Sequence, residues 1–337
     1  MKKSIFLLFL VLVCLVTTGC YDMVDIEDIG SVAAIFVDSD SITYCTVTAS
    51  PDEKKYSYEL YTSDVGNLYT GMNTLSERTG KEISLSHMEA VMFSADCPID
   101  RVKENINALL GRTNSHPKSL VACYEGGGED FAKDILEGAD ISTGKHLRHL
   151  LDNRFSGVAL CTAMEFCYGV NFEGGGSVAP LIASEDGDIT YTGLVYASPQ
   201  GMVSIPRPCS DIINAVKNQG KKVNYGEKSP VEIECTSYDV VYDKVANRAD
   251  ISAEFELRGF GSSMQTEAVG KDIREGMEYI VALKDSGFDI LDIYTDIRKT
   301  FYTIPAFENY VTARGGAVSC VRNVDVNIRT GVGGEKE

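Results

Sequence analysis

Short apolar runs with polar positions between them recur along the chain and predict β-strands. The clearest pair is SVAAIFVD at 31–38 and ITYCTVTA at 42–49, which the turn DSDS at 38–41 separates. Further strands are predicted at 83–94, 119–125, 178–184, 188–198 and 317–331. Strands are thus expected in both halves of the chain.

The second half contains the longest alternating stretch. Residues 228–259 indicate a long β-hairpin with its turn near Lys244 to Asn247. In the final predicted strand, side chains at alternate positions point to opposite faces, so one face is expected to be apolar and the other polar. The apolar positions are Val324, Val326 and Ile328, and the polar ones are Asp325, Asn327 and Arg329.

Apolar residues at helical spacing predict helices between the strands. Leu68, Met72 and Leu75, for example, would share one face of a helix over 64–78. Further helices are predicted at 98–112, 125–140, 142–155, 155–170, 210–219 and 264–301, the last interrupted near 285–289. Helices and strands mix without a strict βαβ period, so the predicted fold class is α+β, with mixed sheets.

The first 19 residues have the pattern of an export signal. Two lysines precede an unbroken apolar run over 5–16, which at 12 residues is shorter than the ~17–25 that a membrane-spanning helix needs. Small residues follow at 17–19, and Cys20 comes next. This order predicts cleavage between Gly19 and Cys20. The alternative, a buried N-terminal helix, would lack the polar positions that such helices normally carry.

The negative charge of the chain makes some classes of binding partner unfavourable. The 337 residues, a length typical of two or three domains, carry 49 acidic and 31 basic side chains and a formal net charge of −18. Such a field repels phosphate backbones and anionic lipid head groups. No nucleic-acid partner is therefore expected, and a membrane location requires an anchor other than charge.

Ten cysteines are spread along the chain without tight pairing. Eight of them lie beyond Cys20, and their spacing dictates no disulfide connectivity. An exported protein could use them as disulfides. Several, however, lie in apolar runs such as ITYCTVTA and VEIECTSY, where a free thiol packs as a small apolar side chain. We favour mostly free, buried thiols, with disulfides as the alternative.

The sequence contains no clear catalytic or metal-binding motif. EGGGED at 125–130 precedes a predicted helix, but it lacks the Lys-Ser/Thr of a P-loop and its acidic residues oppose an anion, so a turn is expected there and at FEGGGS, 172–177. His146 and His149 are spaced i, i+3, but the two neighbouring basic residues oppose a metal ion. No nucleophile elbow and no CxxC pair occur. No enzyme activity, cofactor or metal is expected.

The segment after the predicted signal resembles a known family. GCYDMVDIEDIGSVAAIFVD at 19–38 is similar to the opening of the spore germination C-subunit lipoproteins, the Ger(x)C family, which begin with Gly-Cys-Trp-Asp and continue into a strand. Three later stretches resemble family motifs in the same order: EISLSHMEAVMFS at 82–94, FAKDILEG at 131–138 and VDVNIRTG at 324–331. The intervening 286–310 is similar to a helical region of the family. The resemblance thus extends over the mature chain as scattered short matches.

Several positions depart from the family pattern. Tyr21 stands where a tryptophan is usual and Phe307 near a second one, so aromatic packing is expected to survive. Met-Val at 23–24 replaces common basic residues, so the basic pair of the family pattern is missing at these positions. Leu-Asp at 291–292 replaces a Phe-Gly pair, and Thr17 a commoner leucine.

The resemblance implies a non-catalytic subunit of a nutrient germinant receptor, acting in spore germination. Members carry lipid (diacylglycerol and palmitate) on the cysteine that corresponds to Cys20 and lie on the outer face of the inner spore membrane. Their partners are two membrane-embedded receptor subunits, and they are built of three small α+β domains. Two acyl chains are enough for stable anchoring, where one is marginal. The resemblance leaves open whether this subunit contacts the germinant.

The expected organisation follows from these patterns. Residues 1–19 form the signal peptide, 20–195 an N-terminal α+β region, and 196–331 a C-terminal α+β region with the hairpin, helices and final strand. A flexible tail is expected at 332–337.

Two other functions fit an exported, lipid-anchored chain. The first is a solute-binding protein of a transporter, a class that usually shows repeated βαβ alternation, which this sequence lacks. The second is a hydrolase, for which the sequence offers no nucleophile arrangement. Both rank below the germinant-receptor subunit.

Overall fold

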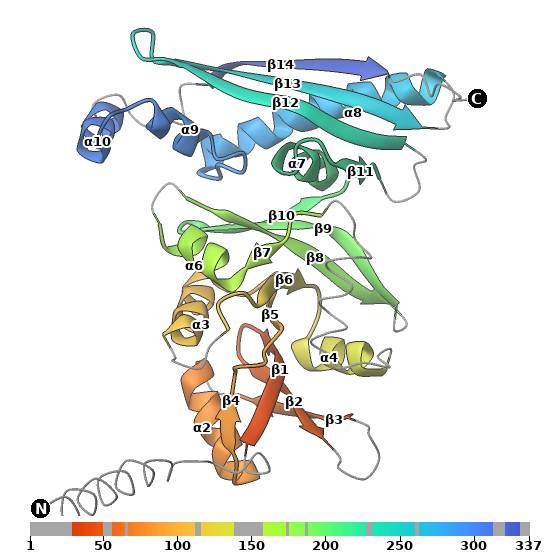
Figure 1. Ribbon diagram of the computed structural model, residues 1–337, viewed down its shortest axis with the longest axis vertical. Coiled ribbons are helices and arrows are strands. Elements are labelled where there is room, and N and C mark those ends of the chain that lie inside the picture. The colour runs from red at the N-terminus through yellow and green to blue at the C-terminus, as the bar shows by residue number, and fades with distance from the viewer. Residues whose placement is uncertain are drawn as a thin grey trace, which may run out of the picture.

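The computed structural model of the protein describes residues 29–49, 56–64, 67–111, 116–137, 158–172, 175–185, 188–226, 231–259, 263–312 and 321–330. Within these residues the strands form two sheets, which succeed one another along the long axis of the molecule (Figure 1). The predicted α+β class with mixed sheets is confirmed.

The larger sheet combines parallel and antiparallel strands. Its described strands are β1 (Ile29–Val37), β2 (Ile42–Ala49), β3 (Tyr56–Ser63), β4 (Glu82–Ser84), β5 (Ala90–Ser94), β6 (Leu120–Tyr124), β7 (Cys161–Thr162), β8 (Ser177–Glu185), β9 (Asp188–Ser198) and β10 (Gly201–Pro206). Their order is β10-β9-β8-β6-β5-β1-β2-β3, with β4 beside β1 and β7 beside β6. The central strands β1, β5, β6 and β8 are parallel, and hairpins flank them on both sides. β5 and β6 are buried at every residue, as strands covered on both faces are.

Helices cover both faces of this sheet (Figure 1). On one face lie α2 (Leu68–Thr79), α3 (Ile99–Leu110) and α6 (Ala163–Asn171), and on the other lies α4 (Gly128–Glu137). Leu68, Ile106 and Phe166 enter one core. Phe131 and Phe36 belong to the core on the opposite face. Each face of the sheet therefore has an apolar layer of its own.

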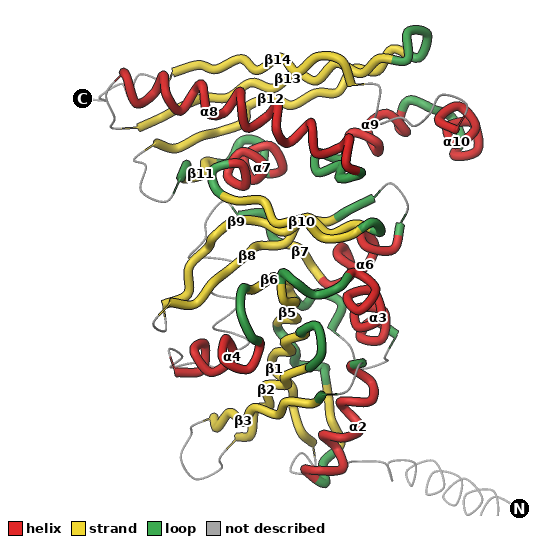
Figure 2. The backbone as a smooth tube through the Cα atoms, turned by 180° about the vertical axis from the view of Figure 1, so that it is seen from behind, coloured by secondary structure: helices red, strands yellow, loops and turns green. Residues whose placement is uncertain are grey.

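The smaller sheet contains β11 (Lys222–Asn224), β12 (Val231–Asp243), β13 (Arg248–Gly259) and β14 (Val321–Thr330), in that order. β12 and β13 form the predicted hairpin, in whose turn Asp243 Oδ1 accepts hydrogen bonds from Val245 N and Ala246 N at 2.8 and 3.1 Å. β14 joins β13 in parallel. α8 (Ser263–Ala282) lies along one face of this sheet (Figure 2).

The two sheets share a third core. α7 (Cys209–Lys217) lies between them, and the short helices η3 (Leu283–Ser286), α9 (Ile293–Lys299) and α10 (Ile304–Thr312) follow α8 (Figure 1). Tyr196 of β9, Ile212 of α7, Phe255 of β13 and Met277 of α8 all belong to this core. The larger and smaller sheets are thus joined by continuous apolar packing.

Most elements lie where the sequence predicts them, and two predictions are wrong. Residues 83–94 are not one strand: β4 and β5 both pair with β1, and a turn between them is closed by Met88 N donating to Leu85 O at 3.1 Å. Residues 155–170 are not one helix, because α6 begins only after Thr162. There Thr162 Oγ1 accepts from Glu165 N, and Glu165 Oε2 accepts from Thr162 N.

Other differences concern elements that the sequence analysis did not predict. The strands β3, β7, β10 and β11 were not predicted. The helix α10 was not predicted from periodicity, but it lies mostly in 286–310, the stretch that resembles a helical region of the family. The predicted helix at 142–155, the signal at 1–19 and the tail at 332–337 lie outside the described residues.

Candidate functional site

The residues predicted to be functional from the sequence lie outside the described part of the chain. Gly19 and Cys20 precede Ile29, where the description begins, and His146 and His149 fall between the described residues 137 and 158. Among the described residues, no three His, Cys, Asp or Glu side chains are grouped so that they could hold a metal ion. No helix in the described ranges is long and apolar enough to cross a membrane.

The described cysteines are free thiols, which confirms the prediction for these residues. They are Cys45, Cys97, Cys123, Cys161, Cys167, Cys209 and Cys235. Burial raises the pKa of Cys97 and Cys161 to about 12 and that of Cys235 to about 11. These thiols therefore stay protonated near neutral pH, where only the thiolate would act as a nucleophile.

In the glycine-rich segment at 125–130, which was predicted to be a turn, residues 125–127 precede α4 and residues 128–130 are the first residues of this helix. Gly128 N, at the start of this helix, donates to the two carboxylate oxygens of Asp38 at 3.2 and 3.1 Å. The Tyr124 hydroxyl donates to Asp38 Oδ1 at 2.7 Å. Because the carboxylate of the chain itself occupies this helix N-terminus, the turn serves the fold and not the binding of a phosphate.

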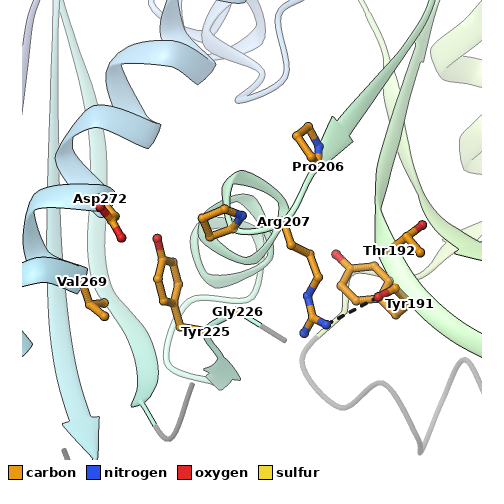
Figure 3. Close-up of a pocket in the computed structure, with 9 residues that line it drawn as sticks. Tyr191, Thr192, Pro206, Arg207, Tyr225, Gly226, Val269 and Asp272 are labelled. Atoms are coloured by element: carbon orange, nitrogen blue, oxygen red, sulfur yellow. Dashed lines mark hydrogen bonds between the residues drawn. The ribbon is translucent and has the colours of Figure 1, made fainter. Parts of the chain in front are cut away.

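A pocket lies where the larger sheet, α7, β11 and α8 meet (Figure 3). Its volume is about 540 Å³. The lining residues are Tyr191, Thr192, Pro206, Arg207, Pro208, Tyr225, Gly226, Val269 and Asp272. The peptide bond between Arg207 and Pro208, at the start of α7, is cis.

Arg207 is held in place by a buried carboxylate. Its Nε lies 3.3 Å from Asp211 Oδ2, and the exposed fractions of the two side chains are 23% and 1%. The guanidinium carbon lies 4.9 Å from the ring centroid of Tyr191, an arrangement typical of cation–π contacts. Burial raises the pKa of Asp211, while Arg207 and the N–H of Gly226 lower it. Asp211 is also the acceptor for Gly226 N at 2.9 Å, so it ties α7 to the end of β11.

Tyr225 and Asp272 form the opposite side of the pocket. The Tyr225 side chain is buried, and its hydroxyl has no hydrogen-bond partner among the described residues. Burial, followed by the nearby carboxylate of Asp272, raises the pKa of Tyr225 above its usual range, so the hydroxyl stays neutral. In Figure 3 this hydroxyl and the Asp272 side chain point toward one another.

The chemistry of this lining suits binding. Aromatic rings and prolines provide apolar walls, and Arg207, Tyr225 and Asp272 add polar groups to the lining. In Figure 3 the Arg207 guanidinium points toward Tyr191, whereas the Tyr225 hydroxyl and the Asp272 side chain lie on the opposite side. The lining contains neither a thiol nor an imidazole. The sequence analysis did not find this site, because its residues come from four separate segments and form no spaced motif.

A comparison with protein families finds a match in the N-terminal half of the chain. Residues 22–184 match the family described as "Spore germination protein N-terminal domain". This range includes the motif-like stretches at 82–94 and 131–138. The comparison with curated proteins finds no match.

A solved structure titled "Crystal Structure of the GerBC protein" is similar over 86% of this chain and 93% of its own, with 13% sequence identity and a TM-score of 0.46. The family match begins two residues after Cys20, and it does not extend to the motif-like stretches at 286–310 and 324–331. Residues 22–184 of the chain are therefore a spore germination protein N-terminal domain.

Proposed function

We propose that this chain is a lipid-anchored, non-catalytic subunit of a nutrient germinant receptor, held on the outer face of the inner spore membrane. The observation that carries the proposal is the position of the family match. It begins at residue 22, two residues after Cys20, at which the sequence predicts cleavage and lipid attachment. A family domain that starts directly after a lipid anchor fits a membrane-bound subunit.

The length of the connection supports a position close to the membrane. Ile29, at the start of β1, follows Cys20 by nine residues. Fully extended, these residues reach at most about 30 Å. The end of the molecule that carries α2 and β4 would then face the membrane, and the smaller sheet would lie at the far end (Figure 1).

The charge of the chain makes an acyl anchor necessary in this proposal. With a formal net charge of −18, the protein is repelled by anionic lipid head groups. The two acyl chains of a diacylglycerol supply stable attachment without help from charge. A short tether also raises the effective concentration of the chain near its partners. In this proposal the partners are two membrane-embedded germinant receptor subunits.

A non-catalytic role is supported by the chemistry of the described side chains. The buried thiols are protonated near neutral pH, and the pocket lining offers binding groups without a nucleophile and base. In this proposal the chain acts by contacting other receptor subunits and not by catalysing a reaction.

The test is nutrient germination of spores that lack this chain. We expect such spores to germinate more slowly with nutrients, and the wild-type chain, supplied in trans, to restore the rate. Affinity purification of the tagged chain from detergent-solubilised spore membranes should recover two multi-span membrane proteins. Normal germination together with lost uptake of a nutrient would contradict the proposal and favour a solute-binding protein of a transporter.

A further inference from the structure

The pocket between the two sheets separates its polar groups into a paired side and an unpaired side (Figure 3). On the β9 side, the guanidinium of Arg207 lies 3.3 Å from Asp211 Oδ2, and the Tyr191 hydroxyl accepts a hydrogen bond from Asn214 Nδ2 at 2.8 Å. On the α8 side, the Tyr225 hydroxyl has no partner among the described residues. The α8 side therefore offers a ligand a free hydrogen-bonding group, whereas the polar groups named on the β9 side are already paired within the chain.

Tyr225 is the feature that points to a ligand. Its side chain is 4% exposed, so water from the bulk does not reach its hydroxyl freely. A buried hydroxyl without a partner destabilises a fold, and a group that hydrogen-bonds to it removes this cost. The Asp272 carboxylate, toward which the hydroxyl points, is exposed on α8 and forms no ion pair with a described residue. A donor placed between these two side chains would satisfy both.

The charges of the lining residues favour a ligand with a positive charge. The positive charge of Arg207 is offset by Asp211, which leaves the carboxylate of Asp272 as the uncompensated charge. The protein as a whole carries −18, so its field also attracts cations. A carboxylate ligand would meet repulsion from Asp272, whereas an ammonium group would be attracted to it.

The other lining residues favour a ligand whose uncharged part is apolar. Tyr191 and Tyr225 present aromatic rings, and Pro206 and Pro208 add aliphatic surface. Aromatic faces bind organic cations favourably. The volume of about 540 Å³ lies within the roughly 300–1,000 Å³ that is common for small-molecule sites.

We propose that this pocket binds a small organic ammonium ligand, whose N–H donors bridge the Tyr225 hydroxyl and the Asp272 carboxylate while its apolar part packs against Tyr191 and the two prolines. The inference goes beyond the proposed function and does not depend on it. It assigns a ligand site to the junction of the two sheets, far from the end that carries β4 (Figure 1).

The test is calorimetric titration of the full chain, purified in a non-ionic detergent, with four probes that share one aromatic body. Phenethylamine carries the ammonium alone, phenethyl alcohol is neutral, 3-phenylpropionate carries a carboxylate, and phenylalanine carries both charges. We expect phenethylamine to bind at least about tenfold more tightly than the other three. N,N,N-trimethylphenethylammonium keeps the charge without N–H donors, and it should bind more weakly than phenethylamine.

Two substitutions examine the two acceptors separately. Tyr225→Phe removes only the hydroxyl, and Asp272→Asn removes only the charge of an exposed residue. Each is expected to raise the Kd for phenethylamine about tenfold, because Tyr225→Phe removes a hydrogen bond to the ammonium group and Asp272→Asn removes the charge that attracts it. Glu278→Gln is the matched control: it removes a carboxylate from α8 at an exposed position that does not line the pocket, and the Kd should not change. Melting temperatures that are not lower than that of the wild type would show that all three variants are folded.

Three results would overturn the proposal. One is the absence of saturable phenethylamine binding up to about 10 mM, both in calorimetry at two temperatures and in equilibrium dialysis, which excludes a site of useful affinity. Another is equal binding of phenethylamine by the wild type and Asp272→Asn. The third is tighter binding of phenylalanine or 3-phenylpropionate, which would assign recognition to a carboxylate on Arg207.

Discussion

Asp289, which precedes α9, is a single residue on which several elements depend. It is 7% exposed, and its carboxylate accepts hydrogen bonds from Ile293 N at 2.9 Å and Tyr294 N at 2.6 Å. Its backbone carbonyl accepts from the Tyr196 hydroxyl of β9 at 3.1 Å. Burial raises the pKa of Asp289 to about 6, the two N–H donors lower it, and Asp292 raises it. Asp289 therefore holds the start of α9 with its side chain and the larger sheet with its backbone carbonyl.

The raised pKa of Asp289 predicts a pH dependence of stability. The pKa of about 6 in the folded chain lies above the ordinary value of 3.8, so between these pH values the folded state binds more protons than the unfolded state. The contribution of Asp289 to the unfolding free energy is thus fully present below pH 3.8 and is lost as the pH rises through about 6. Chemical unfolding of the wild type and of Asp289→Asn at intervals across this range measures it. The variant should show a smaller fall in unfolding free energy, and parallel curves would contradict the assignment.

Two positions where the chain departs from the family pattern are explained by their surroundings. Phe307, near a usual tryptophan, is fully buried, and its ring lies 4.8 Å from Tyr294 and 5.3 Å from Phe301. The expected aromatic packing at Phe307 is therefore confirmed. Asp292, which replaces a glycine, has a φ of 56°, a left-handed conformation that aspartate tolerates better than most residues. Its carboxylate also pairs with Lys217 of α7 at 2.7 Å.

At the scale of elements, the alternation of apolar and polar residues in β14 corresponds directly to its half-buried and exposed faces. Val324, Val326 and Ile328 are half-buried and pack against the core shared by the two sheets. Asp325, Asn327 and Arg329 are exposed. The predicted alternation of the final strand is therefore confirmed.

The apolar face of β14 gives a second prediction. Val326→Asp would place a charge against that shared core without a partner, and we expect a loss of about 1–3 kcal/mol in unfolding free energy because Val326 is only half-buried. Asn327→Asp introduces the same side chain on the exposed face and should change it by less than about 0.5 kcal/mol. Denaturant unfolding of both variants measures the difference. Equal stabilities would mean that the face of β14 carrying Val326 does not pack on a core.

Elements with long regular patterns were predictable, whereas short ones depended on tertiary contacts. The β12–β13 hairpin and α3 carry strong periodicity and lie where they were expected. The two-residue strand β7 exists only through pairing with β6, which no local pattern reveals. The split between β4 and β5 was missed because the turn between them contains the buried Leu85 and Met88, so apolar residues continue through the break. The start of α6 was detectable, since Thr162 and Glu165 have capping-box spacing.

At the scale of the whole molecule, the anchor could be predicted from the sequence, whereas the pocket could not. The anchor is a contiguous pattern, an apolar run followed by small residues and Cys20, so it can be predicted without a structure. The pocket assembles Tyr191, Arg207, Tyr225 and Asp272 from separate segments, and only the packing of α7 and α8 against the larger sheet brings them together. Sites of this second kind require the tertiary structure.

Lipid attachment at Cys20 is the central requirement of the proposed function, and metabolic labelling with an alkyne fatty acid tests it most directly. Wild-type chain and Cys20→Ala would be compared for label, for size on a gel and for the membrane fraction in which they are recovered. We predict that the wild type is labelled and shortened by the removal of residues 1–19, whereas Cys20→Ala is unlabelled and keeps its full length. Equal labelling and processing of the two proteins would contradict the central claim.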